Sequence, residues 1–278
     1  MLKIFNQISK STSELTTKSY STSFSFGIKA LNKSIQQPIY DIYGFVRFAD
    51  EIVDTFHNFN KKELLKKFKK DTFHAIESGI SLNPILNSFQ SVVNEYNIDH
   101  NLINLFFNSM FMDLNSSIHD DDSYKKYILG SAEVVGLMCL KIFVDGDENK
   151  YIQLKPHAMS LGSAFQKVNF LRDINDDFVK LGRTYFPGVD MNNFTEFDKM
   201  LIEDDIIKDF ENALIGIKQL PSSSKGGVYL AYIYYYKLFK KIKTVPYNEI
   251  FNKRIRVQNS NKIFLMFQSL VKNQFNMI

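Results

Sequence analysis

The chain has 278 residues, of which 45% are hydrophobic, and it contains only 12 glycines and 6 prolines. This composition favours one large helical domain over a sheet-rich protein with many tight turns. The formal net charge of +4 is too small to indicate a nucleic-acid partner, and no zinc-finger or RNA-binding signature supports one. A single cysteine, Cys139, excludes an internal disulfide and a cysteine-rich zinc site, so we expect a reducing, cytoplasmic setting.

Apolar residues recur at three- and four-residue spacing through most of the chain, for example over residues 63–79 and 101–114, and this spacing predicts amphipathic helices. Turn-forming residues interrupt it near positions 38, 84, 119–123, 145–150, 186–193, 221–227 and 246. We therefore predict an all-α protein of about nine or ten helices in one domain, residues 1–278. The most apolar stretch is broken by Lys141 and is shorter than the roughly 20 residues of a membrane span.

The first unusual stretch is YGFVRFADEIVDTF, residues 43–56. On a helix at about 100° per residue, Tyr43, Arg47, Asp50 and Asp54 share one stripe about 60° wide. The other positions are mostly apolar, so this helix should be buried nearly all round. Its polar stripe must then line a cavity or meet a partner.

A second acidic stretch, QKVNFLRDINDDFVKLGRTYFP, occupies residues 166–187. The same helical geometry places Gln166, Asn169, Asp173 and Asp177 on one stripe, with Arg172 beside it. Each stretch thus offers two aspartates four residues apart, close to an arginine and among large apolar side chains.

Paired carboxylates in a cleft that excludes water need a cation, because two of them about 6 Å apart repel by roughly 3 kcal/mol at an effective dielectric near 20. Mg²⁺ fits best, with Mn²⁺ as an alternative, since it prefers oxygen ligands and is often shared with substrate phosphates. Zinc or iron would normally recruit histidine, and none of the five histidines falls near these stripes. The competing interpretation is that Arg47 and Arg172 neutralise the acids in buried ion pairs, although each stretch has at least two acids per arginine.

A third pair with the same spacing, Asp205 and Asp209, serves as a contrast. It lies among Glu203, Asp204 and Lys208, which predicts a solvated helix surface. A like-charge pair there costs only a few tenths of a kcal/mol and needs no cation.

In order and spacing, the two acidic stretches resemble the squalene and phytoene synthases, enzymes that join two allylic prenyl diphosphates. The family's first motif is similar to DEIVD at residues 50–54, preceded here by Tyr43 and Arg47. Its second is similar to Q-x-x-N-x-L-R-D-x-x-x-D, which runs here from Gln166 to Asp177. The resemblance implies an isoprenoid synthase helical bundle around a central cavity. It also implies that Asp50, Asp54, Asp173 and Asp177 are metal ligands, and that the catalytic residues are these four with Tyr43, Arg47 and Arg172.

Weaker matches extend the resemblance over nearly the whole chain: STSFSFG at residues 21–27, Asp113, YILGSAEVVGLM from Tyr127, GRTYFP with Arg183, and Tyr235. The substrate-binding residues that it implies are Ser21, Ser23, Phe24, Tyr127, Gln166, Asn169, Tyr185 and Tyr235. One departure is Glu133, which replaces a glycine common in relatives close to the expected tunnel wall. A carboxylate there could narrow the tunnel and favour the shorter substrate, or it could act on the carbocation.

The leading hypothesis for function is a phytoene synthase that condenses two geranylgeranyl diphosphates, requires Mg²⁺ and needs no NADPH. The alternative is squalene or dehydrosqualene synthase acting on two farnesyl diphosphates, and the third is a non-enzymatic relative that uses the fold for binding. Basic residues gather in YKLFKKIK and NKRIRVQNSNK near the C-terminus. They predict either a solvated helix face or a patch that contacts anionic lipid, so a cytoplasmic protein peripheral to the membrane is one expectation.

Overall fold

The computed structural model describes residues 1–115, 120–180, 185–252 and 255. Within these ranges it contains helices and turns but no strand, which confirms the all-α prediction. The α-helices are α1 (Leu2–Tyr20), α2 (Thr22–Lys29), α3 (Lys33–Asp54), α4 (Lys61–Ser78), α5 (Pro84–Glu95), α6 (His100–Asn115), α7 (Asp121–Ile128), α8 (Val134–Phe143), α9 (Glu148–Ile174), α10 (Glu196–Gln219) and α11 (Ser222–Lys243). The described residues also contain three short helical turns. Two are π-helical, η1 (Leu129–Glu133) and η2 (Asn175–Lys180), and one is a 3₁₀ turn, η3 (Met191–Asn193).

Turn residues in the sequence supply the helix ends. Gly79 ends α4 in the left-handed conformation, at a φ of 68°, which glycine adopts without strain. The side chain of Asn83 accepts a hydrogen bond from the backbone N–H of Ile85 at 3.0 Å and caps α5. Thr195 and Asp198 form a reciprocal capping box at the start of α10.

Phenylalanine side chains pack α3 against α4, α5 and α6. Phe45 of α3 stacks on Phe89 with ring centroids 3.8 Å apart, and Phe68, Phe106 and Phe107 surround the pair. Phe45, Phe89, Phe106 and Phe107 are fully buried. This aromatic core fixes one face of α3, so that the face with the acidic motif turns toward α8 and α9.

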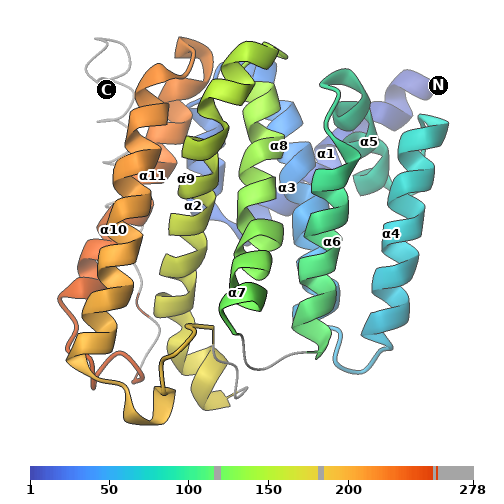
Figure 1. Ribbon diagram of the computed structural model, residues 1–278. Helices are drawn as coiled ribbons and strands as arrows, with labels where there is room; N and C mark the ends of the chain where they lie inside the picture. The colour runs from blue at the N-terminus through green and yellow to red at the C-terminus, as the bar shows by residue number, and fades with distance from the viewer. Residues whose placement is uncertain (116–119, 181–184, 253–254, 256–278) are drawn as a thin grey trace.

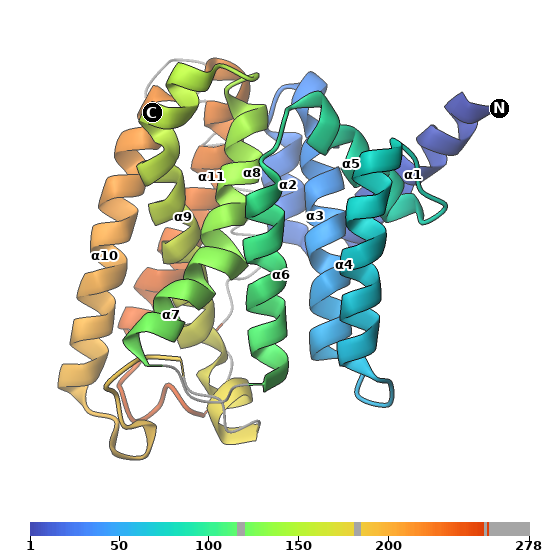
Figure 2. The ribbon, with the colours of Figure 1, turned by 45° about the vertical axis from the view of Figure 1, so that its right-hand side comes forward.

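The long helices stand side by side as a bundle, with α2, α3, α8, α9 and α11 grouped around its interior (Figures 1 and 2). Helices α2 and α11 approach closely because each has a glycine at the contact. A Cβ atom on Gly227 would lie only 2.6 Å from the carbonyl oxygen of Gly27, so no larger residue fits there without a backbone shift. Across the described residues, none of the helices combines the length and the apolar character needed to span a bilayer.

Candidate active site

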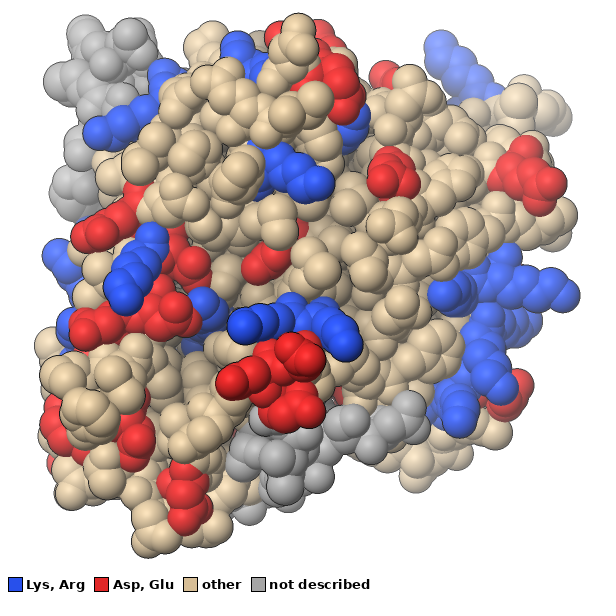
Figure 3. All heavy atoms as spheres, in the orientation of Figure 1, with Lys and Arg blue, Asp and Glu red and all other residues tan. Residues whose placement is uncertain are grey.

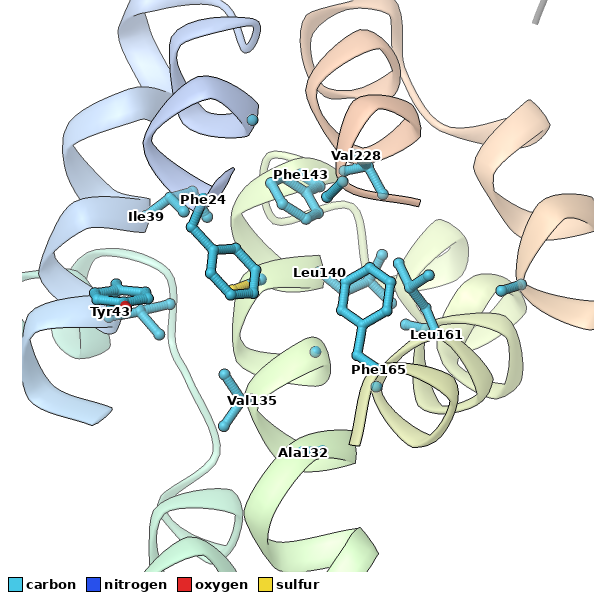
Figure 4. A pocket seen from close by; sticks show the side chains of 18 of the residues that line it. Phe24, Ile39, Tyr43, Ala132, Val135, Leu140, Phe143, Leu161, Phe165 and Val228 are labelled. Carbon is cyan, nitrogen blue, oxygen red and sulfur yellow. The ribbon is translucent and has the colours of Figure 1, made fainter. Parts of the chain in front are cut away.

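A cavity of about 340 Å³ lies between α2, α3, η1, α8, α9, α10 and α11. Most of its wall is aliphatic or aromatic, and Phe24 and Phe165 project toward it from opposite sides (Figure 4). Its volume is within the range of small-molecule sites in proteins. The charged and amide side chains that line it belong to Arg47, Asp50, Gln166 and Asn169.

Helix α9 forms the longest wall of the cavity. Its lining residues follow one helix face, and they are Leu154, His157, Ala158, Leu161, Gly162, Phe165, Gln166 and Asn169. The distance along the axis from Leu154 to Asn169 is about 22 Å at the usual rise per residue. The two amides stand at the end near the second acidic motif, whereas the opposite end is mostly apolar. The cavity is therefore a long, largely apolar space with one polar end.

Aromatic rings gather next to the polar end. The Phe24 ring lies 5.6 Å from that of Tyr43 and 6.1 Å from that of Tyr235, measured between centroids. Phe165 stacks on Tyr235 at 3.9 Å, and the phenol of Tyr235 donates to Oδ1 of Asn169 at 3.4 Å. All five residues line the cavity, so several π faces are available to a cation inside it.

Asp50 carries its carboxylate at the polar end without a balancing contact. It lines the cavity and makes no hydrogen bond or ion pair within the described part of the chain. Burial, and then the negative charge of Asp54, raise its pKa to about 7, and Arg47 only partly offsets them. Asp54 is exposed one turn further along α3. Asp50 thus lines the polar end of the cavity, which we call its mouth because the neighbouring Asp54 is exposed, whereas Asp54 itself stands outside the lining.

Arg47 is turned onto a neighbour in its own helix. Its guanidinium donates to Glu51 and lies 4.3 Å from the centroid of the Tyr20 ring, while its Nε is buried without a partner. The competing interpretation of neutralising ion pairs is therefore not met at Asp50, because Arg47 pairs with Glu51 and Asp50 has no hydrogen bond among the described residues.

In the second motif, Arg172 and Asp173 form a bidentate pair, with the Nε–Oδ1 distance at 2.9 Å and the Nη2–Oδ2 distance at 2.5 Å. Here the interpretation of neutralising ion pairs is correct for Asp173. The expectation of one continuous α-helical stripe is wrong beyond Ile174, because Asp177 lies in the π-helical turn η2. Gln166 and Asn169 line the cavity, whereas Asp173 and Asp177 stand outside its lining.

No group of three or more histidine, cysteine or acidic side chains is drawn together for a metal within the described ranges. The four aspartates nevertheless fit a hard divalent cation chemically. All their donors are carboxylate oxygens, and the raised pKa of Asp50 shows that this buried negative charge lacks compensation. Asp173 would have to exchange its contact with Arg172 for the cation.

Tyr127 and Tyr185, expected to bind substrate, pack beside the cavity and not on its wall. Tyr127 donates to Oδ2 of Asp113 at 3.0 Å, and the ring of Tyr185 stacks on Phe170 at 4.1 Å. The charge of Asp50 reaches Tyr127 and contributes to a pKa raised chiefly by burial. Their role with substrate stays a prediction, and Arg183 lies outside the described residues.

The serines of the first segment shape the local backbone. Ser21 caps α2 by accepting a hydrogen bond from the backbone N–H of Phe24 at 3.1 Å. Its hydroxyl is also close enough to Tyr43 to offset slightly the rise in the phenol's pKa that burial causes. Ser23 is half-buried and lies outside the cavity lining.

Phe165 and Ser131 are among the lining residues that the sequence analysis did not name. Phe165 precedes Gln166 and lies four residues before Asn169, so the stripe rule could have found it. Ser131 lines the cavity with a buried Oγ that has no hydrogen-bond partner in the described residues. It sits in the π-helical turn η1, a feature that periodicity does not predict.

Glu133 does not line the cavity, so the expectation that it narrows a tunnel is wrong. Ser131, Ala132 and Val135 take the wall positions. Its carboxyl instead has a pKa raised to about 7, by burial and by the charge of Asp209 on α10.

The contrasting pair on α10 also differs from the expectation of a fully solvated surface. Asp205 and Asp209 both accept from the buried Lys167, at 2.5 and 2.8 Å, and Asp209 also accepts from Ser163 at 2.7 Å. The side chain of Asp205 is 57% exposed, but that of Asp209 is only 19% exposed. These ion pairs leave no signal in the local sequence of α10, because Lys167 comes from α9.

Comparison with known proteins places these features in context. The family model described as squalene/phytoene synthase matches residues 17–261. Phytoene synthase 1 of Solanum lycopersicum is 24% identical over 266 residues, which cover 89% of this chain and 64% of the relative. The 4,4'-diapophytoene synthase of Staphylococcus haemolyticus is 24% identical over 206 residues, which cover 70% and 69%. The chain therefore spans less than two thirds of the length of the tomato protein.

Solved structures share the fold. A dehydrosqualene synthase in complex with a ligand superposes with a TM-score of 0.82 at 18% identity, covering 97% of this chain and 98% of that one. A squalene synthase from Alicyclobacillus acidocaldarius gives a TM-score of 0.76 at 18% identity, covering 86% and 95%. Because the family model also covers most of the sequence, including both acidic motifs, the chain belongs to the squalene/phytoene synthase family.

Proposed function

We propose that this protein is a phytoene synthase that condenses two geranylgeranyl diphosphates head to head. In this reaction one allylic diphosphate ionises and the resulting cation alkylates the second substrate, which gives a cyclopropyl diphosphate, free diphosphate and a proton. The cyclopropyl diphosphate then loses its own diphosphate, rearranges and releases a proton to form phytoene. The electrons balance without a reductant, so NADPH is not required.

The observation that carries this choice is the depth of the cavity along α9. Its lining extends from Asn169 to Leu154, about 22 Å along the helix axis. An extended carbon chain advances about 1.2 Å per bond, so a C20 tail spans roughly 18 Å and a C15 tail roughly 13 Å. Both tails fit, but the longer tail covers more of the apolar wall and leaves less of it without contacts.

The polar end supplies the chemistry of ionisation. Asp50 and Asp54 on α3, with Asp173 and Asp177 from the second motif, would hold Mg²⁺, or Mn²⁺ in its place. Bound there, the ion neutralises negative charge on the diphosphate and makes it a better leaving group. Arg47 and Arg172 add fixed positive charge beside the same group. Gln166 and Asn169 donate or accept hydrogen bonds at the boundary between the diphosphate and its tail.

The aromatic residues next to the polar end protect the carbocation. Phe24, Tyr43, Phe165 and Tyr235 present ring faces to the space where the tail begins. A cation there gains from the ring quadrupoles, and the apolar wall keeps out water that would quench it. The raised pKa of Tyr43, about 12, keeps its phenol protonated at neutral pH.

A second candidate is dehydrosqualene synthase, which would use two farnesyl diphosphates. Its support is the similarity to the diapophytoene synthase of Staphylococcus haemolyticus and the close match in fold to a dehydrosqualene synthase. The same polar end would serve it, and only the length of the tail differs.

One assay separates these possibilities. Purified protein is incubated with Mg²⁺ and either C15 or C20 diphosphate, with and without NADPH, and the products are identified by chromatography. We expect phytoene from the C20 substrate at a rate that NADPH does not change, and no product in excess EDTA. Preferred turnover of C15 diphosphate would contradict the C20 assignment, squalene formed only with NADPH would contradict the reductant-free reaction, and full activity in EDTA would contradict the metal site.

A further inference from the structure

Helix α1 has its apolar and polar faces reversed relative to an ordinary surface helix. Its buried residues are Ser9, Ser13, Thr16 and Thr17, all hydroxyl side chains. Its exposed residues include Ile4, Ile8 and Leu15, whose exposed fractions are 62%, 57% and 66%. A helix that packs on a core normally turns its aliphatic residues inward.

The hydroxyl groups on the inner face of α1 have hydrogen-bond partners. The inward orientation of this polar face is therefore compatible with stable packing. Ser9 and Thr17 donate to carbonyl groups one turn earlier in the helix, and Ser13 shares a 2.7 Å hydrogen bond with Ser88 of α5. Small hydroxyl residues also let α1 approach α3 closely, since a Cβ on Gly44 would lie 2.9 Å from Oγ of Ser13. The aliphatic residues are left on the outside.

These aliphatic residues lie along one side of the helix, with the exposed Ser11 between the second and the third, and we call them the α1 stripe: Ile4, Ile8 and Leu15. At about 100° per residue they fall within about 40° of the helix circumference, and they extend for about 17 Å along its axis. Leu2, at the start of the same helix, is also exposed, by 60%. A helix with this pattern is typical of one that lies in the surface layer of a bilayer.

Positive charge gathers at the same end of the molecule. Helix α4 has six lysines against three acidic residues, and α1 has three lysines against one glutamate. These two helices together hold more positive charge than the whole chain, whose net charge is +4. Figures 1 and 2 place both helices at the end of the bundle opposite α10, and basic side chains cover α4 in Figure 3.

The C-terminal end of α1 leads directly to the mouth of the cavity. The ring of Tyr20, its last residue, lies 4.3 Å from the guanidinium carbon of Arg47, which lines the cavity. Ser21, the next residue, caps α2 and contacts the backbone of Phe24. A surface that holds α1 would therefore lie near the polar end of the cavity.

We propose that the α1 stripe inserts into the surface layer of an anionic membrane, with the lysines of α4 facing the lipid headgroups. A second copy of the chain is a poorer occupant, because a stable protein interface takes about 20–30 residues from each side and the stripe offers three aliphatic side chains. Anionic lipid matches both the apolar strip and the excess of lysine. This moves the expected lipid contact from the C-terminal basic residues to the N-terminal end.

The test is flotation of the full chain with vesicles of phosphatidylcholine, with and without phosphatidylglycerol, and no substrate. The stripe variant carries Ile4→Gln, Ile8→Gln and Leu15→Gln, since glutamine keeps helix propensity. Its matched control carries Ile152→Gln and Ile215→Gln, exposed aliphatic residues on α9 and α10. We expect partitioning into anionic vesicles to fall by at least about 100-fold in the stripe variant and to stay unchanged in the control.

Lysine substitutions test whether the positive charge of α4 contributes to membrane binding. Replacing Lys66, Lys67 and Lys70 of α4 with glutamine should weaken binding to anionic vesicles by roughly tenfold or more, and added salt should remove that difference. The matched control replaces Lys237, Lys240 and Lys241 of α11 and should bind as the wild type does. Far-ultraviolet circular dichroism and urea unfolding check that each variant is folded.

Three outcomes would overturn the proposal. The stripe variant could float as well as the wild type, or the wild type could bind no vesicle at all. The wild type could also be a dimer that the stripe variant converts to a monomer without any vesicle binding, which would make a second copy the occupant. Because the assay contains no prenyl diphosphate, its failure is distinct from a failure of the proposed reaction.

Discussion

Two aspartate pairs with identical spacing have opposite surroundings in this protein. Asp50 lies at the mouth of the cavity with Asp54 one turn away, and among the described residues Asp50 has no hydrogen-bond partner while Arg47 pairs with Glu51. Asp205 and Asp209 on α10 converge on Lys167, which α9 presents at 2.5 and 2.8 Å.

A lysine from another helix balances the pair on α10, whereas no cation of the described residues contacts Asp50 directly. Burial of a carboxylate is tolerated where an ammonium group balances its charge. The pair on α10 has such a group in Lys167, so its role is to stabilise the fold. At the cavity mouth the compensation is incomplete, and the pKa of Asp50 rises to about 7. We propose that a cation arriving with the substrate completes the balance of charge at Asp50.

The largest effect is expected at the cavity mouth. Asp50→Asn and Asp173→Asn should each lower kcat by about 100-fold or more, the scale for removing one preorganised electrostatic contact from a transition state. Asp50→Asn should leave the free energy of unfolding unchanged or higher, because it removes an uncompensated buried charge. Steady-state kinetics with the preferred prenyl diphosphate and urea unfolding measure the two quantities. The exposed Asp204→Asn is the matched control, and an equal loss of kcat there would end the distinction.

A smaller effect, on stability and not on chemistry, is expected for the pair on α10. Asp209→Asn leaves the buried ammonium of Lys167 with one exposed partner, so we expect a loss of roughly 2 kcal/mol in the free energy of unfolding. The folded enzyme should keep its kcat, since Asp209 lies outside the cavity lining. Urea unfolding followed by circular dichroism gives the first value. A large loss of kcat with unchanged stability would place this pair in the active site.

Asp41 is a further buried acid, and no cation of the described residues contacts it directly. The contribution of its carboxyl to the free energy of unfolding should depend on pH. Burial raises its pKa to about 7, and Gln37, the distant charge of Lys10, Ser88 and Ser13 offset this only in part. The unfolded carboxyl ionises near its ordinary pKa of 3.8, so the folded state holds the proton between about pH 4 and 7. The stability that this group contributes is complete below pH 4 and is lost as the pH rises through 7.

Asp41→Asn cannot ionise and should remove that dependence. We expect the variant to be more stable than the wild type by roughly 2 kcal/mol at pH 8 and equal to it at pH 4. Chemical unfolding at a series of pH values measures the difference. A constant difference across the series would mean that Asp41 keeps its charge in the folded protein.

The smallest effect is expected at Asp205. Its side chain is 57% exposed, and Lys167 keeps its contact with Asp209 when Asp205 is neutralised. Asp205→Asn should therefore change the free energy of unfolding by less than about 1 kcal/mol and leave kcat unchanged. The same two assays apply. A loss as large as that of Asp209→Asn would show that both carboxylates are required to hold Lys167.

Much of the fold could be predicted because helices carry a local signal. The three- and four-residue spacing marks the helices, and residues such as Gly79, Asn83 and Thr195 mark their ends through chemistry that needs no tertiary contact. The π-helical turns η1 and η2 were not predicted, since their wider winding leaves no distinct pattern in the sequence. For that reason the helical pattern placed Asp177 on an α-helical stripe, whereas the position expected for Glu133 came from the family resemblance.

The residue types that each helix presents follow from the sequence alone: the mostly apolar α3 with its acidic stripe, the two amides of α9 that precede Asp173, and the hydroxyl face of α1. What each face meets depends on the tertiary packing. Lys167 reaches Asp205 and Asp209 because α9 packs on α10, and Phe165 faces the cavity because Tyr235 of α11 stacks on it. The stability of a buried charge depends on the atoms that surround it, and those come from segments far apart in the chain.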